Sequence, residues 1–445
     1  MSTSAYEETE IVTESGRRLH RNYKWHVVAM LWFIAFFNYA DRQAISAVYP
    51  ILKTEMSLSD TQIGWLGASF GIAYGLSAPF AGLVVDRVNR KKAILFGLHV
   101  WSVICMLTAA SWKFPHLLFW RTAEGLGETF YFPASMSLLS DYHGKRTRSR
   151  AMGFHQTSVY IGSIAGGVFA ALIAQQWGWR WSFIVFGGMG ILLGIVLHWT
   201  LHEPRRGSAD LEDLGEHKKQ VTRNISFGEF MGIVVRNPTL LLLMAAFMCA
   251  NFVAAVLLTW MPSFVNREFG VSLAASALIG TSYLQLASML AAPLGGYVAD
   301  KLRSMTVRGR LLVQLVGLLG GAPFVYMCSW SPTVTMLTIS LLAWGFFKGL
   351  YDSNIWAGVF DVVRPEARGK TVGMMNMVAW AVGGGSAPIV IGMIADASNL
   401  RTALAFTSVV YVIAAVLMLL AILFSIGRDV RKMEDSLRAE ASVGA

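Results

Sequence analysis

Residues 82–92 read Gly-Leu-Val-Val-Asp-Arg-Val-Asn-Arg-Lys-Lys, a short basic stretch set between two long apolar runs. A related stretch, Gly296-Tyr-Val-Ala-Asp300-Lys301, follows another apolar run 214 residues after it. Likewise, Arg150-Ala-Met-Gly153 is echoed by Arg368-Gly-Lys-Thr-Val-Gly373. Two echoes at nearly the same offset predict a chain made of two similar halves.

The composition indicates a chain that lies mostly in lipid. Of 445 residues, 55% are hydrophobic and only 14% are charged, against the ~25% charged residues of an ordinary soluble domain. The aromatic content of 12% and the 42 glycines are typical of helices packed in a membrane, where small residues allow close approach and Trp and Tyr gather at the interfaces. The mean hydropathy of +0.51 agrees with this.

The net charge of +10 does not indicate a nucleic-acid partner, because the basic residues lie in short loops between apolar runs and not on one continuous face. The three cysteines, Cys105, Cys249 and Cys328, each lie inside an apolar stretch without a neighbouring Cys or His cluster. We interpret them as packing residues and expect neither a disulfide framework nor a metal site.

Twelve apolar runs are long enough to cross a hydrocarbon core of ~30 Å as helices. The sequence therefore predicts an all-α membrane protein with twelve transmembrane helices in two pseudo-symmetric six-helix bundles. The predicted spans are 25–50, 61–85, 92–111, 115–140, 151–174, 182–202, 239–264, 275–299, 311–329, 333–361, 371–395 and 402–426.

The distribution of basic residues predicts the orientation. Loops on one side hold fifteen Lys and Arg residues, whereas those on the other side hold only Lys53, Lys113, Arg180, Arg267 and Arg401. Because basic loops stay in the cytoplasm, we expect both termini inside a cell (inner) membrane. The polar stretch before residue 25 has no cleavable signal peptide pattern, so we expect the first helix to act as its own insertion signal.

These patterns give the expected domain organisation. A cytoplasmic tail (1–24) precedes the first six-helix bundle (25–202), and a hydrophilic linker (203–237) leads to the second bundle (238–426) and a cytoplasmic tail (427–445).

Charges within the predicted helices are the first candidates for function, since a charge at mid-bilayer costs at least ~2.5 kcal/mol and is rarely left without a partner or a task. Helix one carries Asp41 and Arg42. Helix four carries Arg121, Glu124 and Glu128, whose spacing places all three on one helical face. We expect this face to point at other helices or a watery cavity, with purely structural ion pairing as the alternative.

The stretch of residues 82–92 resembles the loop signature of the major facilitator transporters, Gly-x-x-x-Asp-Arg-x-x-Arg-Lys-Lys, at the end of helix two where that family has it. The resemblance implies a charge network that closes the inner gate. The gating residues would be Gly82, Asp86, Arg87, Arg90, Asp300 and Lys301.

Two further motifs resemble the anion:cation symporters, a major facilitator family that includes bacterial sugar-acid importers. They are Asn38-Tyr39-Ala40-Asp41-Arg42 on helix one and Arg121-x-x-x-Gly125-x-x-Glu128-x-x-x-Phe132-Pro133 on helix four. The resemblance implies proton coupling at Asp41 and Glu128, and anion binding or gating at Arg42 and Arg121. A substrate carboxylate at Arg121 would release Glu128 to take up a proton, so that anion and proton move together.

The remaining candidates for substrate binding are less specific. Trp356 and Asn376 match positions that line the cavity of sugar-acid importers, although Trp356 is equally a packing residue. On helix five those importers carry a Gln where this chain has Val159, so Gln156 and Tyr160, one turn apart, would take over. His155 is a packing residue or a proton carrier. Helix ten adds three polar residues, of which the first two either neutralise each other or bind substrate: Lys348, Asp352 and Asn354.

A second family also fits. Spinster-type lysolipid and sphingolipid carriers share the helix-one motif and an Arg-x-x-x-Gly-x-Gly-Glu-x-x-Tyr pattern, which Arg121 to Tyr131 match in full. Phe132-Pro133, Trp356 and Asn376 favour the organic-anion reading.

We therefore expect a proton-coupled symporter of a small organic anion such as a sugar acid, working by alternating access near mid-membrane. Its expected partners are the anionic substrate, protons and the lipid bilayer, with a monomer as the expected state and no cofactor. An enzyme is disfavoured because neither HExxH nor GxSxG occurs. A channel and a membrane-embedded sensor remain the alternatives of another class.

Overall fold

The computed structural model describes residues 10–13, 16–20, 22–85, 88–143, 145–204, 225–364 and 367–443. Asp86 and Arg87, two of the predicted gating residues, lie outside the described residues. Contacts divide the chain into two compact units: residues 1–48 with 77–220 (unit 1), and residues 49–76 with 221–445 (unit 2). Residues 49–76, which run from the end of the first helix into the second, thus pack with the second half of the chain.

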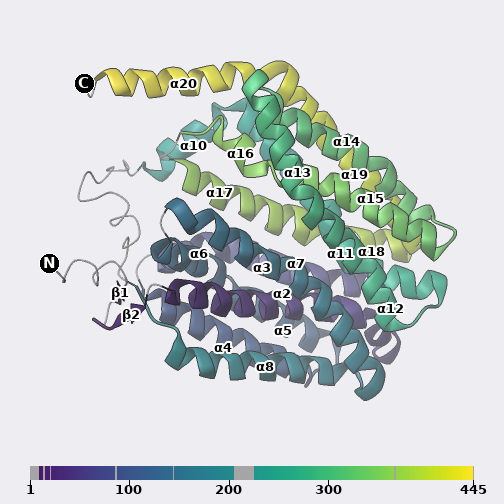
Figure 1. Cartoon of the computed structure of the whole chain (residues 1–445). Coiled ribbons are helices and arrows are strands. Elements are labelled where there is room, and N and C mark those ends of the chain that lie inside the picture. Colours follow the sequence, from purple (N-terminus) through teal and green to yellow (C-terminus); the bar gives the residue numbers. More distant parts are fainter. Residues whose placement is uncertain are drawn as a thin grey trace. The chain divides into compact units, whose positions relative to one another are not determined.

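Unit 1 is a helical bundle preceded by a small hairpin. Its elements, of which α2 and α3 continue into unit 2, are β1 (Glu10–Val12), β2 (Arg18–His20), α2 (Tyr23–Glu55), α3 (Asp60–Val85), α4 (Arg90–Thr108), α5 (Phe114–Glu128), α6 (Tyr131–Tyr142), α7 (Lys145–Trp177) and α8 (Trp179–Thr200). Helices α4 and α8 run side by side (Figure 1). The hairpin lies where the sequence predicted only a polar tail.

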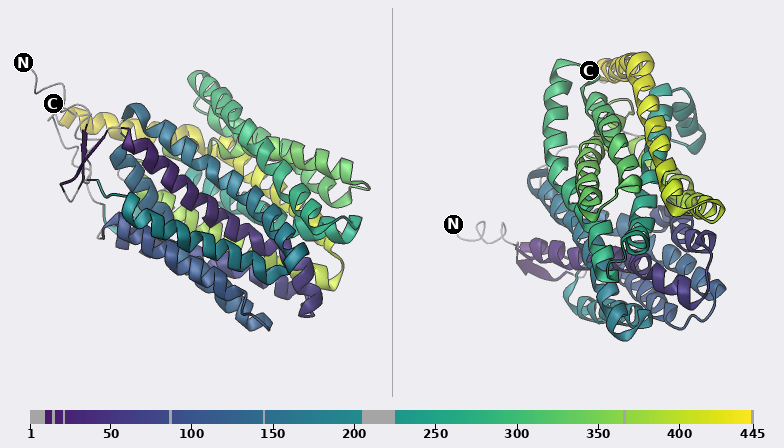
Figure 2. Two further views of the ribbon diagram at one scale, coloured as in Figure 1. Left: turned by 60° about the horizontal axis from the view of Figure 1, so that its bottom comes forward. Right: turned by 90° about the vertical axis from the view of Figure 1, so that its right-hand side faces the viewer.

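Unit 2 is also helical throughout its described part. Its elements are α10 (Phe227–Val235), α11 (Pro238–Phe269), α12 (Leu273–Ala277), η1 (Leu278–Ser282), α13 (Tyr283–Met305), α14 (Gly309–Trp330), α15 (Val334–Asp352), α16 (Ile355–Phe360), α17 (Arg368–Met377), η3 (Val378–Gly384), α18 (Gly385–Ala397), α19 (Leu400–Leu420), η4 (Ala421–Ser425) and α20 (Ile426–Val443). The last part of the predicted linker is helix α10. Long helices α13, α14, α15 and α19 pack alongside one another (Figure 2).

Length and composition qualify nine helices of the described residues as membrane spans. Three further helical segments, α2, α3 and α5 with α6, lie at the other three positions where the sequence predicts membrane helices. Helix four is interrupted: α5 ends at Glu128 and α6 begins at Tyr131. Pro133 explains the break, because it has no N–H to donate to the carbonyl of Thr129, four residues earlier.

Small residues bring helix backbones together in both units, as is common in membranes. In unit 1, Gly166 of α7 faces α2 so closely that a Cβ would lie 2.3 Å from the Cα of Ala40. In unit 2, a Cβ at Gly64 of α3 would lie 2.3 Å from the carbonyl oxygen of Pro388 in α18. The first of these contacts fixes the segment of α2 that carries Asp41.

Candidate functional site

The predicted charged residues of helices one and four form one buried cluster in unit 1. Asp41 and Arg42 come from α2, and Arg121, Glu124 and Glu128 come from α5. Four of the five are buried, and the Arg42 side chain is only 11% exposed. The 3, 4 and 7 spacing thus places the α5 charges on an inward face, as predicted.

Each arginine of the cluster holds a different glutamate. Arg42 donates from Nε to Oε2 of Glu128 at 2.5 Å, and its guanidinium lies 4.6 Å from the centre of the Tyr39 ring. Arg121 donates from Nη1 to Oε2 of Glu124 at 2.6 Å and from Nη2 to the carbonyl of Arg42 at 2.9 Å. The sequence analysis linked Arg121 to Glu128; in the structure that carboxylate belongs to Arg42, because Glu124 is nearer to Arg121 on α5.

Asp41 differs from the two glutamates. It is 1% exposed, and neither of its carboxylate oxygens has a hydrogen-bond partner among the described residues. One oxygen of Asp41, the sulfur of Cys105 on α4 and one oxygen of Glu124 all lie within 4.8 Å of one another. A bare carboxylate in such a place is costly, so this position calls for a proton or another cation.

Helix α7 contributes the polar candidates near Val159, which are His155, Gln156 and Tyr160. His155 is buried and shares a hydrogen bond of 2.9 Å with Tyr131, whose hydroxyl donates to the carbonyl of Leu31. Because the Tyr131 proton goes to Leu31, the Nε2–H of His155 donates to Tyr131. Gln156 is exposed and Tyr160 is half-buried one turn further along.

In unit 2, the polar candidates of helix ten lie close to one another. Lys348 and Asp352 form an ion pair, so each at least partly neutralises the other. The amide of Asn354 donates to the carbonyls of Gly295 and Leu350 at 3.2 Å, at the break between α15 and α16. The same amide donates to the hydroxyl of Ser353 at 2.9 Å, so its donors have partners within unit 2.

The other second-half candidates are half-buried. Trp356 packs edge-on against Phe247 with ring centres 5.7 Å apart, and Asn376 lies in α17.

Two of the predicted gating residues, Arg90 and Asp300, belong to charge clusters, one in each unit. In unit 1, buried Arg90 donates to Glu203 at 2.7 Å and also pairs with Asp141. In unit 2, Arg310 pairs with Asp361 at 2.6 Å and with Asp300 at 3.1 Å.

The clusters repeat each other, since Arg310 and Asp361 each lie 220 residues after Arg90 and Asp141. Sequence analysis did not assign Asp141 or Asp361 to these clusters, because both lie outside the echoed motifs, although this common offset was available as a signal. Lys301 is exposed.

A further charge cluster in unit 2 was missed by sequence reasoning. Arg267 donates to both carboxylate oxygens of Asp60, at 3.1 and 2.8 Å, and Lys53 donates to the same carboxylate at 2.7 Å. Asp396 accepts from the backbone N–H groups of Asp60 and Thr61 at the start of α3. Ion pairs and hydrogen bonds thus join the helix ends of unit 2 that lie on the side with few basic residues.

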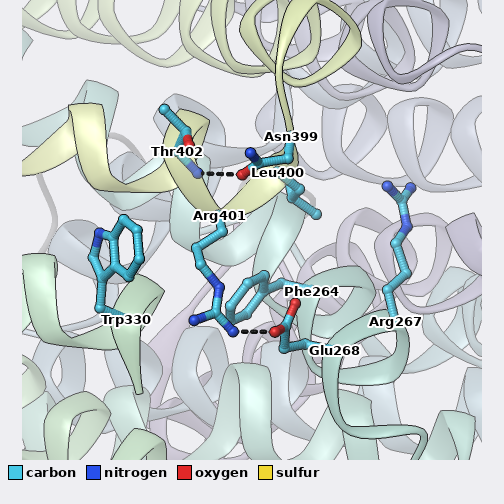
Figure 3. A pocket seen from close by; sticks show the side chains of 8 residues that line it. All are labelled: Phe264, Arg267, Glu268, Trp330, Asn399, Leu400, Arg401 and Thr402. Carbon is cyan, nitrogen blue, oxygen red and sulfur yellow. Dashed lines mark hydrogen bonds and ion pairs between the residues drawn. The ribbon is translucent and has the colours of Figure 1, made fainter. Parts of the chain in front are cut away.

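One pocket of about 440 Å³ lies beside this cluster in unit 2 (Figure 3). Arg401 points to Glu268 and pairs with it, while its guanidinium also lies 5.5 Å from the Trp330 ring centre. None of the predicted substrate-binding residues lines this pocket. Its lining consists of Phe264, Arg267, Glu268, Trp330, Asn399, Leu400, Arg401 and Thr402.

Comparison with known proteins places the chain in a family. Residues 31–388 and 265–442 match the profile of the Major Facilitator Superfamily. The chain belongs to this superfamily and is a multi-pass membrane transporter of all-α fold.

The chain is similar both to a protein named as a spinster homolog and to a probable sugar-acid transporter. Protein spinster homolog 1 of Xenopus laevis is 26% identical over 422 residues, which cover 89% of this chain and 78% of that protein. The probable L-galactonate transporter of Escherichia coli (strain K12) is 25% identical over 379 residues, 83% of each chain.

A solved structure shares the fold. The crystal structure of a bacterial homolog of the human lysosomal transporter Spinster, in an inward-facing and unoccupied conformation, matches with a TM-score of 0.79. It is 24% identical and covers 92% of this chain and 98% of that one. At this identity the match supports the major facilitator fold, and substrate must be argued from the site.

Proposed function

We propose that this transporter is a proton-coupled symporter of a small organic anion, with a sugar acid as the substrate class. The observation that carries the proposal is the buried cluster in unit 1, where Arg42 and Arg121 each hold a glutamate and Asp41 has no hydrogen-bond partner among the described residues.

The charges of this cluster explain the coupling. With all groups ionised, three carboxylates face two guanidinium groups, so one negative charge remains, and a proton on Asp41 cancels it. An anion that takes the place of Glu124 at Arg121, or of Glu128 at Arg42, displaces a buried carboxylate. Because a displaced buried carboxylate is costly, it takes up a proton. Anion and proton therefore bind together, whichever arginine the anion uses.

Side chains with neutral donors and acceptors would then select the hydroxyls of the anion. On α7, Gln156 and Tyr160 are accessible, unlike buried His155. In the second half of the chain, half-buried Trp356 and Asn376 are the candidates with neutral side chains, and the Lys348–Asp352 ion pair is a candidate for a charged group of the anion. The name of the Escherichia coli relative, a probable L-galactonate transporter, supports a sugar acid.

A Spinster-type lipid carrier is the second candidate. The relatives named spinster homolog 1 and the Arg121 to Tyr131 pattern favour it. The buried cluster with two ion pairs favours the hydrophilic anion, because an acyl chain gains nothing from displacing charges.

A thermal-shift screen separates the two candidates, because a ligand that binds only the folded state stabilises it by mass action. The purified protein is heated with sugar acids, amino-acid-like anions and lysolipids. We expect a sugar acid to raise the melting temperature of the wild type and of Arg180→Ala, but not of Arg121→Ala. Arg180 is a matched control because it is an arginine of unit 1 that lies over Trp179, outside the cluster. Stabilisation by lysolipids alone would overturn the organic-anion proposal.

The proposed setting is a cell inner membrane with both termini in the cytoplasm and a monomeric transporter. The excess of basic residues in the loops that include Arg90 and Arg310 supports this orientation.

A further inference from the structure

Two side chains from two other helices approach Asp41 of α2. They are Cys105 of α4 and Glu124 of α5, and one ligand atom from each of the three residues lies within 4.8 Å of the others. All three side chains are buried, with exposed fractions of at most 3%. The group has a sulfur and two carboxylates, the donor types found around zinc in proteins.

The charges around this group leave room for a cation. Arg121 pairs with Glu124, but Asp41 has both oxygens without a hydrogen-bond partner within the described ranges. The remaining charges nearby, Arg42 and Glu128, neutralise each other. One uncompensated carboxylate therefore points into a group of potential ligands, a costly arrangement until a positive charge joins it.

The donor set indicates which cation fits. Calcium and magnesium take six or more oxygen ligands, whereas a thiolate selects a soft or borderline ion such as Zn²⁺ or Cd²⁺. With Cys105 as a thiolate, the three ligands carry three negative charges. Arg121 and a divalent ion together carry three positive charges, so the site becomes neutral. Three protein ligands also leave a fourth tetrahedral position open.

We propose that Asp41, Cys105 and Glu124 form a binding site for one thiophilic divalent cation, with zinc as the natural candidate. The ion competes with protons, because all three ligands bind it in their deprotonated forms. The site goes beyond the proposed transport function, since metal binding needs no substrate and no movement of substrate.

The test uses the purified full-length protein and Cd²⁺, whose bond to a thiolate gives a charge-transfer band in the ultraviolet. Because the ligands are buried, the protein is equilibrated with the ion for hours. We expect one Cd²⁺ per chain by equilibrium dialysis, displacement by Zn²⁺, and weaker binding as the pH falls. Cys105→Ala and Cys105→Ser should both abolish the band, and Asp41→Asn and Glu124→Gln should weaken binding by at least about tenfold.

Cys328→Ala is the matched control, because Cys328 is a buried cysteine of unit 2. This variant should bind Cd²⁺ like the wild type. Size-exclusion profiles and circular dichroism identify any variant that fails to fold, and the pair of Cys105 substitutions provides a second chance of a folded protein. The proposal is overturned if the wild type gives no band, or if a folded Cys105 variant keeps it. A wild type that transports an anion but binds no Cd²⁺ would refute the metal site alone.

Discussion

Arg121 donates to Glu124 at 2.6 Å, one turn along the same helix, and leaves Glu128 to Arg42 of the neighbouring helix α2. The two ion pairs are therefore separate: one lies within α5, and the other joins α5 to α2. Displacing the first frees a side chain on one helix, whereas displacing the second also loosens a contact between helices.

Glu124→Gln should strengthen anion binding. The substitution removes the carboxylate that competes for Arg121, and a charged hydrogen bond contributes about 1.5–3 kcal/mol, so the affinity should rise about tenfold or more. Calorimetric titration with the anion found by the thermal-shift screen measures this. Glu268→Gln serves as the control, since Glu268 pairs with Arg401 in the exposed pocket of unit 2. An unchanged affinity in Glu124→Gln would show that the anion does not displace this carboxylate.

Arg42→Ala should destabilise the protein more than the double variant Arg42→Ala/Glu128→Gln. Removing the arginine leaves Glu128 buried and unpaired, which costs on the order of 3 kcal/mol. Neutralising the glutamate as well should recover most of that loss. Thermal unfolding in detergent compares the two variants. If the double variant were as unstable as the single one, the ion pair would not be the source of the loss.

Gly64→Ala should destabilise unit 2, because the new Cβ would lie 2.3 Å from the carbonyl oxygen of Pro388. Backbone cannot yield as a flexible side chain does, so a cost of about 1–3 kcal/mol is expected from overpacking. Gly188→Ala is the matched control: it is also in a helix, and nothing lies within 4 Å of its Cβ position in the described structure. Equal melting temperatures of the two variants would contradict the close packing of α3 on α18.

The N-terminal hairpin should loosen at acidic pH. Arg17 donates to Nε2 of His202, beyond the end of α8, so this nitrogen must be unprotonated. Burial lowers the pKa of His202, and Arg17 and Lys91 lower it further, while the carbonyl of Thr200 raises it. When the hairpin separates from His202, the pKa of this histidine returns toward its ordinary value, so it binds protons more readily. Docking is therefore complete above the ordinary histidine pKa of about 6.5 and weakens as the pH falls below it.

Amide hydrogen exchange of residues 18–20 measures this effect, with protection factors compared at about pH 7.5 and about pH 5.5, on either side of the ordinary histidine pKa. Protection should fall at the lower pH in the wild type and stay constant in His202→Gln, which lacks the titrating group. Protection in the wild type that does not depend on pH would rule out His202 as the cause.

The helices and the buried face of α5 could be predicted from the sequence, because both follow from local periodicity. Apolar runs of membrane length marked the twelve helical segments, and the spacing of Arg121, Glu124 and Glu128 placed them on one face. The repeated basic loops also indicated two similar halves, which the paired clusters of Arg90 and Arg310 support.

The partners of these charges could not be predicted, because they depend on contacts between distant segments. Nothing local showed that Arg42 takes Glu128, or that Cys105 lies beside Asp41. The outer cluster of Asp60 and Arg267 joins residues 207 positions apart, and its charges look like ordinary loop residues in the sequence. Pro133 is a local signal for the break between α5 and α6, but the apolar run continues through it, so the sequence predicted one helix there.

The most direct test of the central claim is uptake of the stabilising anion into liposomes that contain the purified protein, under an imposed proton gradient. The account predicts that wild type accumulates the anion above its external concentration and loses this when the gradient is dissipated. The double variant Glu124→Gln/Glu128→Gln lacks both carboxylates that an anion displaces from the arginines, so it should exchange anion across the membrane but not accumulate it. Accumulation by this variant at the wild-type level, or wild-type uptake that ignores the proton gradient, would contradict proton coupling through this cluster.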